Sequence, residues 1–480
     1  MGPRAEPGPI CSRTRQEGRI SPRAPLRDRD TMTQLDPKRP ITLSEARERI
    51  VEQVFEKGLG GAELGRIGLE PEFLVLRVDE GGEPVGRVPL EGQGSVLEAL
   101  EPLVAAGEVT RAAGPPPVFH LPNGGRITFE PGAQVEHSTC IHENAAAAME
   151  DVEQTAALIE RAMARVGGQM VAVGCDVWSD RSLVEQQLRA PRYHAMAAYF
   201  DRRSPHGRVM MRHTTSLQVN LDLGSRVVAT RRWHLGNLLA PLASASFACS
   251  PEDGAVSRRA QAWQGLDPSR TGFPKQLLTD ACADPGESYA EFALDADVLL
   301  FGGGSSAAQP GRAGFRMADW IQSGHPEHGR PQIADLDYHL STLFPEVRLR
   351  GFFELRSCDG VPARWRGVNA VFWAGLFYDS AACEAALELL EPSRASLSAA
   401  WLDAARAGLA SPFVRDLAAP IWDLALAGAA RLPGPWFRPA DLAAADEFIG
   451  RFIRPLRSPA LELAAALVEG PAQALAWTRR

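Results

Sequence analysis

Acidic side chains alternate in one short segment near the start of the ordered part of the sequence. Glu70 and Glu72, in Gly68-Leu-Glu-Pro-Glu-Phe73, are two residues apart, so on a strand both carboxylates point to the same face. Carboxylates at this spacing repel each other, and hard oxygen ligands suit Mg²⁺ or Mn²⁺, so an inward-facing pair predicts a divalent cation. Pro71 fits an edge strand or a position whose amide is not needed. The pair alone is explained more simply by a solvated strand face.

Three further segments carry side chains of the same kind. In chain order these are Glu130, Gln134 and Glu136; Gln218 and Asn220; and Glu354 and Arg356. The first three share a face only if the bend at Pro131-Gly132 is a bulge or a tight turn. Random surface strands would favour Lys, Thr and Ser over this selection. The four segments together therefore predict a curved sheet whose concave side is a polar site rather than a core.

The elements that position these residues follow from the hydrophobic pattern. Strands are predicted over 66–78, 126–136, 213–223 and 348–356. A helix is predicted to begin near Thr42 or Ser44, and a long Ala-rich helix over 141–166. The pattern predicts a protein that contains both strands and helices.

Three regions are predicted along the chain. Residues 1–40 are rich in Arg and Pro and predict a disordered extension. Residues 41–385 form the main domain, which carries the polar face. Residues 386–480 are rich in Ala and Leu and predict a helical region packed on that domain.

Composition and missing motifs exclude several classes of function. The net charge of −8 argues against a nucleic-acid surface, and no apolar run approaches the roughly 18 residues that span a bilayer. Seven scattered cysteines without a CxxC pair predict reduced thiols in the cytoplasm. The sequence has no P-loop, no GxGxxG after a strand, no HExxH and no GxSxG. What remains is a carboxylate cage for a Mg-nucleotide, in which metal ions neutralise phosphate charge.

Several blocks of this sequence resemble the glutamate-cysteine ligases of the type shared by plants and many bacteria. They include Gly68-Leu-Glu-Pro-Glu72, Phe129-Glu-Pro-Gly-Ala-Gln-Val-Glu136, Met211-Arg-His-Thr-Thr-Ser-Leu-Gln-Val-Asn-Leu-Asp222, Asp267-Pro-Ser-Arg-Thr-Gly272 and Glu354-Leu-Arg-Ser-Cys-Asp-Gly360. Any one block is weak, but their order and spacing along the chain are specific. The resemblance implies a glutamine-synthetase-like α+β fold. In this fold a curved, mostly antiparallel sheet, with helices on the outside, cups ATP, metal ions and glutamate.

The resemblance also implies roles for individual residues. The metal cage would consist of Glu70, Glu72, Glu130, Glu136, Gln218 and Glu354. Substrate and ATP contacts would come from Arg192, Tyr193, Arg212, Asn220, Arg259 and Arg356. Glu354 and Arg356 would be the catalytic pair. Two positions depart from the family pattern: Ala133 replaces a second glycine, and His137 replaces an aliphatic residue, which predicts a more polar rim of the site.

The activity implied is the ATP-dependent joining of glutamate to cysteine through γ-glutamyl phosphate, with two or three Mg²⁺ ions, or Mn²⁺. Residues 41–385 would be the ligase domain, and the C-terminal region resembles the bacterial branch that serves ergothioneine rather than glutathione synthesis. Two alternatives stay open: a ligase of the same fold with a different amine acceptor, and an inactive ligand-binding protein. The intact acidic set argues against the inactive protein. Only small-molecule partners are expected, with no nucleic acid or membrane, for a monomer or weak homodimer.

Overall fold

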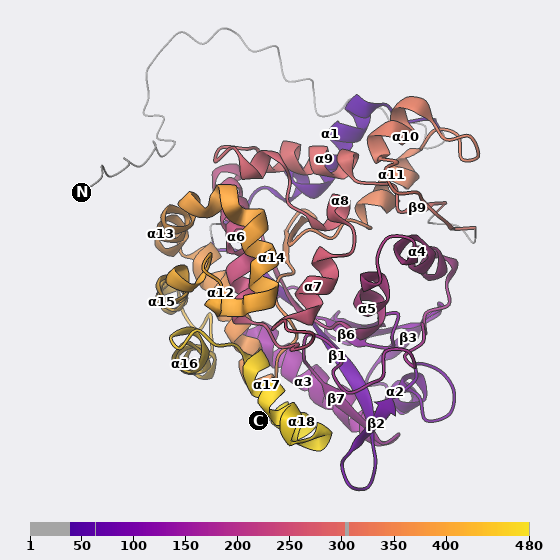
Figure 1. Ribbon diagram of the computed structural model, residues 1–480, viewed down its shortest axis with the longest axis vertical. Helices are drawn as coiled ribbons and strands as arrows, with labels where there is room; N and C mark the ends of the chain where they lie inside the picture. Colours follow the sequence, from indigo (N-terminus) through magenta and orange to yellow (C-terminus); the bar gives the residue numbers. More distant parts are fainter. Residues whose placement is uncertain (1–38, 63, 303–306, 480) are drawn as a thin grey trace.

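A computed structural model describes residues 39–62, 64–302 and 307–479 (Figure 1). Nearly all of the predicted disordered extension, 1–40, lies outside these residues. Among the helices that are described, none combines the length and the apolar character that a membrane crossing requires.

A ten-stranded antiparallel sheet forms the frame of the protein, in the order β11-β12-β8-β1-β6-β5-β4-β3, with β2 and β7 also paired to β1. The strands are β1 Ile67–Val78, β2 Pro84–Arg87, β3 Thr110–Ala112, β4 Val118–His120, β5 Arg126–Phe129, β6 Val135–Ser138, β7 Gly168–Val171, β8 Leu217–Leu221, β11 Val347–Leu349 and β12 Phe353–Leu355. A separate small hairpin joins β9 Leu300–Phe301 to β10 Gln309–Pro310.

Strand β1 has the bounds that the alternating pattern predicts, but it lies in the middle of the sheet. The edge-strand interpretation of Pro71 is therefore wrong. The amide of Glu72 donates to Ser216 O beside β8 at 3.0 Å, whereas the amide of Leu69 donates to Thr139 Oγ1 on the other side at 3.0 Å. Pro71 has the parity of Leu69, so its nitrogen faces away from β8 and the β1–β8 ladder is preserved.

Two predicted strands are hairpins. Segment 126–136 turns at residues 130–134, so β5 and β6 pair with each other. Segment 348–356 turns at Gly351, whose φ is 78°, so Arg348 faces Glu354 across β11 and β12. The third predicted strand, 213–223, is shorter than expected, because a helix continues to His213 and β8 begins at Leu217.

Helices surround the sheet. They are α1 Leu43–Val54, α2 Val96–Ala105, α3 Ala145–Ala164, α4 Pro191–Asp201, α5 His206–His213, α6 Arg226–Ser246, α7 Arg258–Gln264, α8 Pro268–Thr271, α9 Pro285–Asp295, α10 Met317–Ser323, α11 Ile333–Leu340, α12 Arg366–Tyr378, α13 Ser380–Leu390, α14 Leu397–Ala407, α15 Arg415–Arg431, α16 Pro439–Phe448, α17 Pro459–Glu469 and α18 Pro471–Trp477. Helix α1 begins at a capping box, in which Thr42 and Glu45 bond each other's backbone amides.

The C-terminal helices share a core with the sheet-bearing part of the chain. Helices α3, α6 and α12 pack on the sheet, and α13 to α16 lie outside α6 and α12 (Figure 1). Phe247, after α6, stacks on Phe448 of α16 with ring centroids 5.4 Å apart, and Phe372 of α12 lies 4.7 Å from Trp422 of α15. The Trp422 indole donates to Ser246 Oγ at 3.0 Å, so its one polar atom is satisfied.

Candidate active site

Acidic and amide side chains of four neighbouring strands meet on one face of the sheet. Glu72 on β1 is paired with Glu136 on β6, and Glu70 on β1 is paired with Gln218 on β8. On the far side of β8, Asn220 is paired with Glu354 of β12. Antiparallel pairing puts directly opposite residues on the same face, so these six side chains come from adjacent positions.

Amide side chains of β8 hold the carboxylates of β1 in place. Asn220 Nδ2 donates to Glu70 Oε1 at 2.9 Å, and Gln218 Nε2 donates to Glu72 Oε1 at 3.3 Å. The backbone amide of Ser216 donates to the second oxygen of Glu72 at 2.8 Å. The side-chain oxygen of Asn220, Oδ1, is buried and has no hydrogen-bond partner within the described residues.

A tight turn adds Glu130 to this face. The amide of Glu130 donates to Gln134 O, and the amide of Ala133 donates to Glu130 O, each at 2.9 Å. A Cβ at Gly132 would lie 2.1 Å from the carbonyl oxygen of Arg212, so only glycine allows this approach. Ala133 has a φ of 66°, in the left-handed region, which explains why a glycine suits this position.

Electrostatics divide the acidic face into two parts. Burial, followed by the charges of Glu136 and Glu354, raises the pKa of Glu70 to about 7. Burial and the neighbouring carboxylates likewise raise the pKa of Glu130 well above its ordinary value, and burial with Glu72 raises that of Glu136. The charged forms of these carboxyl groups are therefore poorly stabilised by their surroundings.

Glu354 forms the other part and is surrounded by arginines. Its carboxylate contacts Arg356 at 2.6 Å, Arg348 at 3.3 Å and Arg350 at 3.4 Å. Burial alone would raise its pKa, but these three guanidinium groups outweigh burial and lower the pKa to about 2. Arg356 also donates to Gln218 Oε1 at 2.5 Å and so joins β12 to β8.

Sequence reasoning did not assign Arg348 and Arg350 to the site. Both face Glu354 because the segment is a hairpin. The glycine at position 351 was the available signal in the sequence, because glycine is common in turns that need a positive φ.

Two of the predicted substrate-contact residues, Arg192 and Tyr193, lie beside this face. Arg192, at the start of α4, lies over the Tyr193 and Tyr338 rings at 5.1 and 5.5 Å and lowers the pKa of Glu130. Burial and Glu130 together raise the pKa of Tyr193 to about 12, so this phenol also borders the acidic face. Both residues therefore lie near the carboxylates of the β5–β6 turn.

Two further arginines differ in their surroundings. Arg259 is buried and donates to Arg356 O at 2.8 Å, and its charge partly opposes the rise that burial causes in the pKa of Glu72. Arg212 instead donates to Val184 O at 3.4 Å, and the charges that act on it are those of Arg208, Asp201 and Glu185. The structure thus brings Arg259 to the acidic set but turns the Arg212 side chain toward α4 and the preceding loop.

The expectation that His137 makes the rim of the site more polar is wrong. His137 follows Glu136 on β6, so its side chain points to the opposite face of the sheet. It is 1% exposed, and burial lowers its pKa to about 4.

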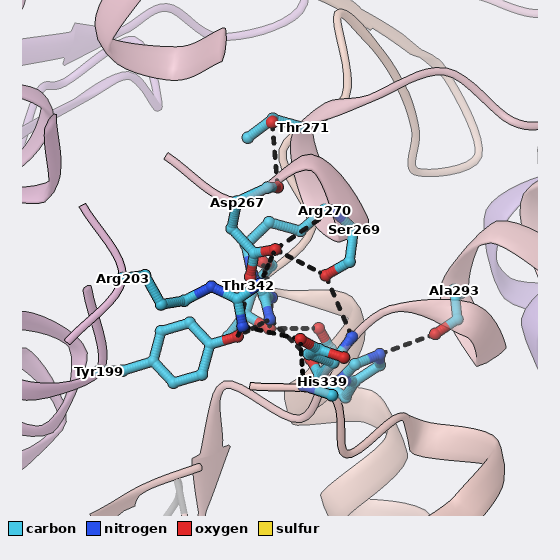
Figure 2. A network of polar contacts seen from close by, with 11 residues as sticks. Tyr199, Arg203, Asp267, Ser269, Arg270, Thr271, Ala293, His339 and Thr342 are labelled. Carbon is cyan, nitrogen blue, oxygen red and sulfur yellow. Dashed lines mark hydrogen bonds and ion pairs between the residues drawn. The ribbon is translucent and has the colours of Figure 1, made fainter. Parts of the chain in front are cut away.

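The Asp267-Pro-Ser-Arg-Thr-Gly272 block builds a buried ion-pair network rather than the acidic face (Figure 2). Asp267 contacts Arg270 at 2.8 Å and Arg203 at 2.9 Å, and it accepts a hydrogen bond from Tyr199 Oη at 2.8 Å. His339 lies nearby and its Nε2 bonds Ala293 O at 2.8 Å, so it is held by the backbone. The network connects α4, α8 and α11.

The acidic face fits a divalent cation. Four carboxylates with raised pKa values and the unpartnered Asn220 Oδ1 offer hard oxygen donors, and the neighbouring arginines are concentrated around Glu354. Hard oxygen donors of this kind suit Mg²⁺.

The chain is similar to known glutamate–cysteine ligases. The model of glutamate-cysteine ligase family 2 matches residues 66–427. Glutamate–cysteine ligase EgtA of Mycolicibacterium smegmatis is 34% identical over 387 residues, which cover 78% of this chain and 86% of that protein. The chloroplastic glutamate–cysteine ligase of Medicago truncatula is 30% identical over 276 residues, 55% of this chain and 52% of that protein.

A solved structure supports the fold alone. Glutamate–cysteine ligase of Francisella tularensis, in complex with AMP, superposes with a TM-score of 0.51 at 12% identity and covers 86% of this chain and 87% of that one. This likeness confirms the predicted glutamine-synthetase-like α+β fold with its mostly antiparallel sheet. By the extent of the family match and the identity to EgtA, the chain belongs to glutamate-cysteine ligase family 2.

Proposed function

We propose that this ligase joins the γ-carboxylate of L-glutamate to the amine of L-cysteine and consumes one ATP. The single observation that carries the proposal is the convergence of Glu70, Glu72, Glu130 and Glu136 on one face, beside the arginine-bound Glu354. Anions without a counter-charge next to a cluster of guanidinium groups are suited to a metal-bound polyphosphate and an acidic substrate.

The reaction needs two bond exchanges. The glutamate γ-carboxylate oxygen bonds to the γ-phosphorus of ATP while the bond to the ADP oxygen breaks, giving γ-glutamyl phosphate and ADP. The neutral cysteine amine then bonds to the acyl carbon, phosphate leaves, and the amine proton passes to solvent. In this scheme Arg356, fixed by Glu354 and Gln218, donates hydrogen bonds to the phosphoryl oxygens.

The metal set proposed for this reaction is Glu70, Glu72, Glu130, Glu136, Gln218 and Glu354. We expect two or three Mg²⁺ ions, or Mn²⁺ in their place. When bound, these ions would supply positive charge that stabilises the transferring phosphoryl group. Asn220 positions Glu70. The substrates would be bordered by Arg192, Tyr193 and Arg259. Arg212 would also contact the substrates, provided that its side chain turns away from Val184 O.

The setting of this reaction is proposed to be the cytoplasm. The six described cysteines are all free thiols, as the reducing compartment requires. We expect a monomer or weak homodimer with small-molecule partners only, and no nucleic acid or membrane. Similarity to the mycobacterial EgtA proteins supports the ergothioneine branch over glutathione synthesis as the consumer of the product.

The test is a phosphate-release assay with Mg-ATP, glutamate and a panel of amines, with product identified by mass spectrometry. Preference for cysteine and formation of γ-glutamylcysteine support the proposal. Equal rates with other amines would identify a ligase with a different acceptor, and absence of turnover would identify a binding protein. Glu388→Gln, at an exposed position on α13, serves as the matched control for glutamate-to-glutamine variants of the acidic face in the same assay.

A further inference from the structure

A second cluster of metal-binding side chains lies on the opposite face of β6 from the acidic face. Cys140 and His142 follow β6, and Asp151 comes from α3. One ligand atom from each of these three residues lies within 4.8 Å of the other two. Cysteine, histidine and aspartate together are typical of zinc sites, whereas Mg²⁺ prefers oxygen ligands alone.

The separations between these atoms lie near the edges of a tetrahedral site. Cys140 Sγ lies 3.3 Å from His142 Nε2 and 3.9 Å from Asp151 Oδ2, and His142 Nε2 lies 2.8 Å from that oxygen. Ordinary Zn–S, Zn–N and Zn–O bond lengths give tetrahedral edges of roughly 3.3–3.6 Å. The two distances from Cys140 Sγ are within a few tenths of an ångström of these edges, whereas His142 Nε2 and Asp151 Oδ2 would have to separate by about 0.5 Å.

A buried histidine without a partner faces the same carboxylate. His137 Nε2 lies 3.5 Å from Asp151 Oδ1, and neither ring nitrogen of His137 has a hydrogen-bond partner within the described residues. Its side chain is 1% exposed and that of Asp151 is 3% exposed. An unpaired imidazole at this depth is costly, and a hydrogen bond to the second oxygen of a metal-bound Asp151 would satisfy one of its nitrogens.

Hydrogen bonds already link the members of this cluster. Cys140 Sγ and His142 Nε2 both donate to Asp151 Oδ2, at 3.9 and 2.8 Å, and Thr155 Oγ1 donates to Asp151 Oδ1 at 3.3 Å. Zn²⁺ would take the place of the protons in the first two of these bonds. His142 Nε2 is also the ring nitrogen that faces Cys140 Sγ, at 3.3 Å. The same geometry excludes a Cys-His-Asp catalytic triad, in which nucleophile and carboxylate use different ring nitrogens.

We propose that Cys140, His142 and Asp151 bind a structural Zn²⁺ ion, and that His137, beside the second oxygen of Asp151, orients this carboxylate. The side chain of His142 is 16% exposed, which gives the ion a path from solvent. The site would join β6, the segment after it and α3. Because Glu136 precedes His137 on β6, the ion would fix the strand that presents Glu136 to the acidic face.

The experiment uses the full chain, stripped of metal with a chelator and titrated with Co²⁺ in excess Mg²⁺. Co²⁺ bound by Cys140 gives a thiolate-to-cobalt charge-transfer band, which a carboxylate site cannot give. Zn²⁺ competition then gives the zinc affinity. We expect one equivalent of Co²⁺ with this band, a loss of affinity of at least about 100-fold in Cys140→Ser and of at least about tenfold in His137→Leu.

Two controls separate this site from other ligands. Cys282→Ser, at an exposed cysteine outside the cluster, and Glu136→Gln, on the acidic face, should both keep the band. The wild-type titration does not depend on how the variants fold, and circular dichroism of each variant checks their folding. Absence of the band in the wild-type protein, or its persistence in Cys140→Ser, would overturn the proposal.

Discussion

Glu72 and Glu136 stand directly opposite each other across the β1–β6 pair. Like charges opposite each other in an antiparallel ladder destabilise a sheet. Burial raises the pKa of both carboxyl groups, and the charge of Glu72 raises that of Glu136 further. The metal-free fold is therefore less stable than the same fold with this repulsion removed.

Replacing Glu136 with glutamine should separate folding from activity. Thr128 and Ser138 both donate to Glu136 Oε1, and the glutamine oxygen can accept the same bonds. We expect a metal-free protein more stable by about 1 kcal/mol, measured by urea unfolding. Ligase turnover should fall by at least about 100-fold. An unchanged kcat would contradict the proposed metal role of Glu136.

The stability of the metal-free protein should depend on the protonation of Glu70. Its folded-state pKa of about 7 exceeds the ordinary value of 4.5, so the folded state binds this proton more tightly than the unfolded state. Full stability is thus present below pH 4.5 and is lost as pH rises through about 7, by up to about 3 kcal/mol.

Comparison with Glu70→Gln separates this effect from that of the buried histidines, whose contribution to stability changes with pH in the opposite direction. Burial lowers the pKa to about 4 for His137, His213, His234 and His339, and these groups lose stability as pH falls. Melting temperatures of the two proteins should agree below about pH 4.5, diverge as pH rises toward 7, and differ by a constant amount above it, where the variant is the more stable. Parallel curves across this range would disprove the assignment.

Gly132→Ala should disrupt the β5–β6 turn. The added Cβ would lie 2.1 Å from Arg212 O, so the backbone must shift, at a cost of about 1–3 kcal/mol. Turnover should fall too, because this turn places Glu130. The matched control is Gly450→Ala, in the π-helical turn Ile449–Ile453, where a Cβ meets no atom within 4 Å. Its thermal unfolding should be unchanged or shifted upward.

Asp267→Asn should lower stability without affecting substrate binding. The change leaves Arg203 and the fully buried Arg270 without their shared carboxylate, which costs about 3–5 kcal/mol. The expected result is a lower melting temperature with an unchanged KM for glutamate at a temperature where the variant is folded. Asp416→Asn, at an exposed surface pair, should cost under about 1 kcal/mol. A large rise in KM would instead place Asp267 in the substrate site.

Residues whose environment follows from alternation were predictable from the sequence. The period of two over β1 gave its bounds and the common face of Glu70 and Glu72. The same rule, applied one residue past Glu136, puts His137 on the opposite face, so the expectation of a polar rim conflicted with a signal already present.

Features that depend on chain reversal or distant contacts were not predictable in this way. The Arg350-Gly351 turn converts a predicted strand into a hairpin and brings Arg348 against Glu354. Cys140 and Asp151 are eleven residues apart, on a loop and a helix, and they meet only because α3 packs on the sheet. Turns and tertiary packing depend on interactions that the local hydrophobic period of the sequence does not reveal.

The rings of Phe247, Phe372, Trp422 and Phe448 pack together, so α15 and α16 cover the aromatic residues of α12 and of the segment after α6. A shortened version ending after α13 would present a broad aromatic surface to water, so it would self-associate rather than act as a smaller working ligase. Any change that loosens α15 or α16 therefore reaches the catalytic strands through α6 and α12, far from any substrate.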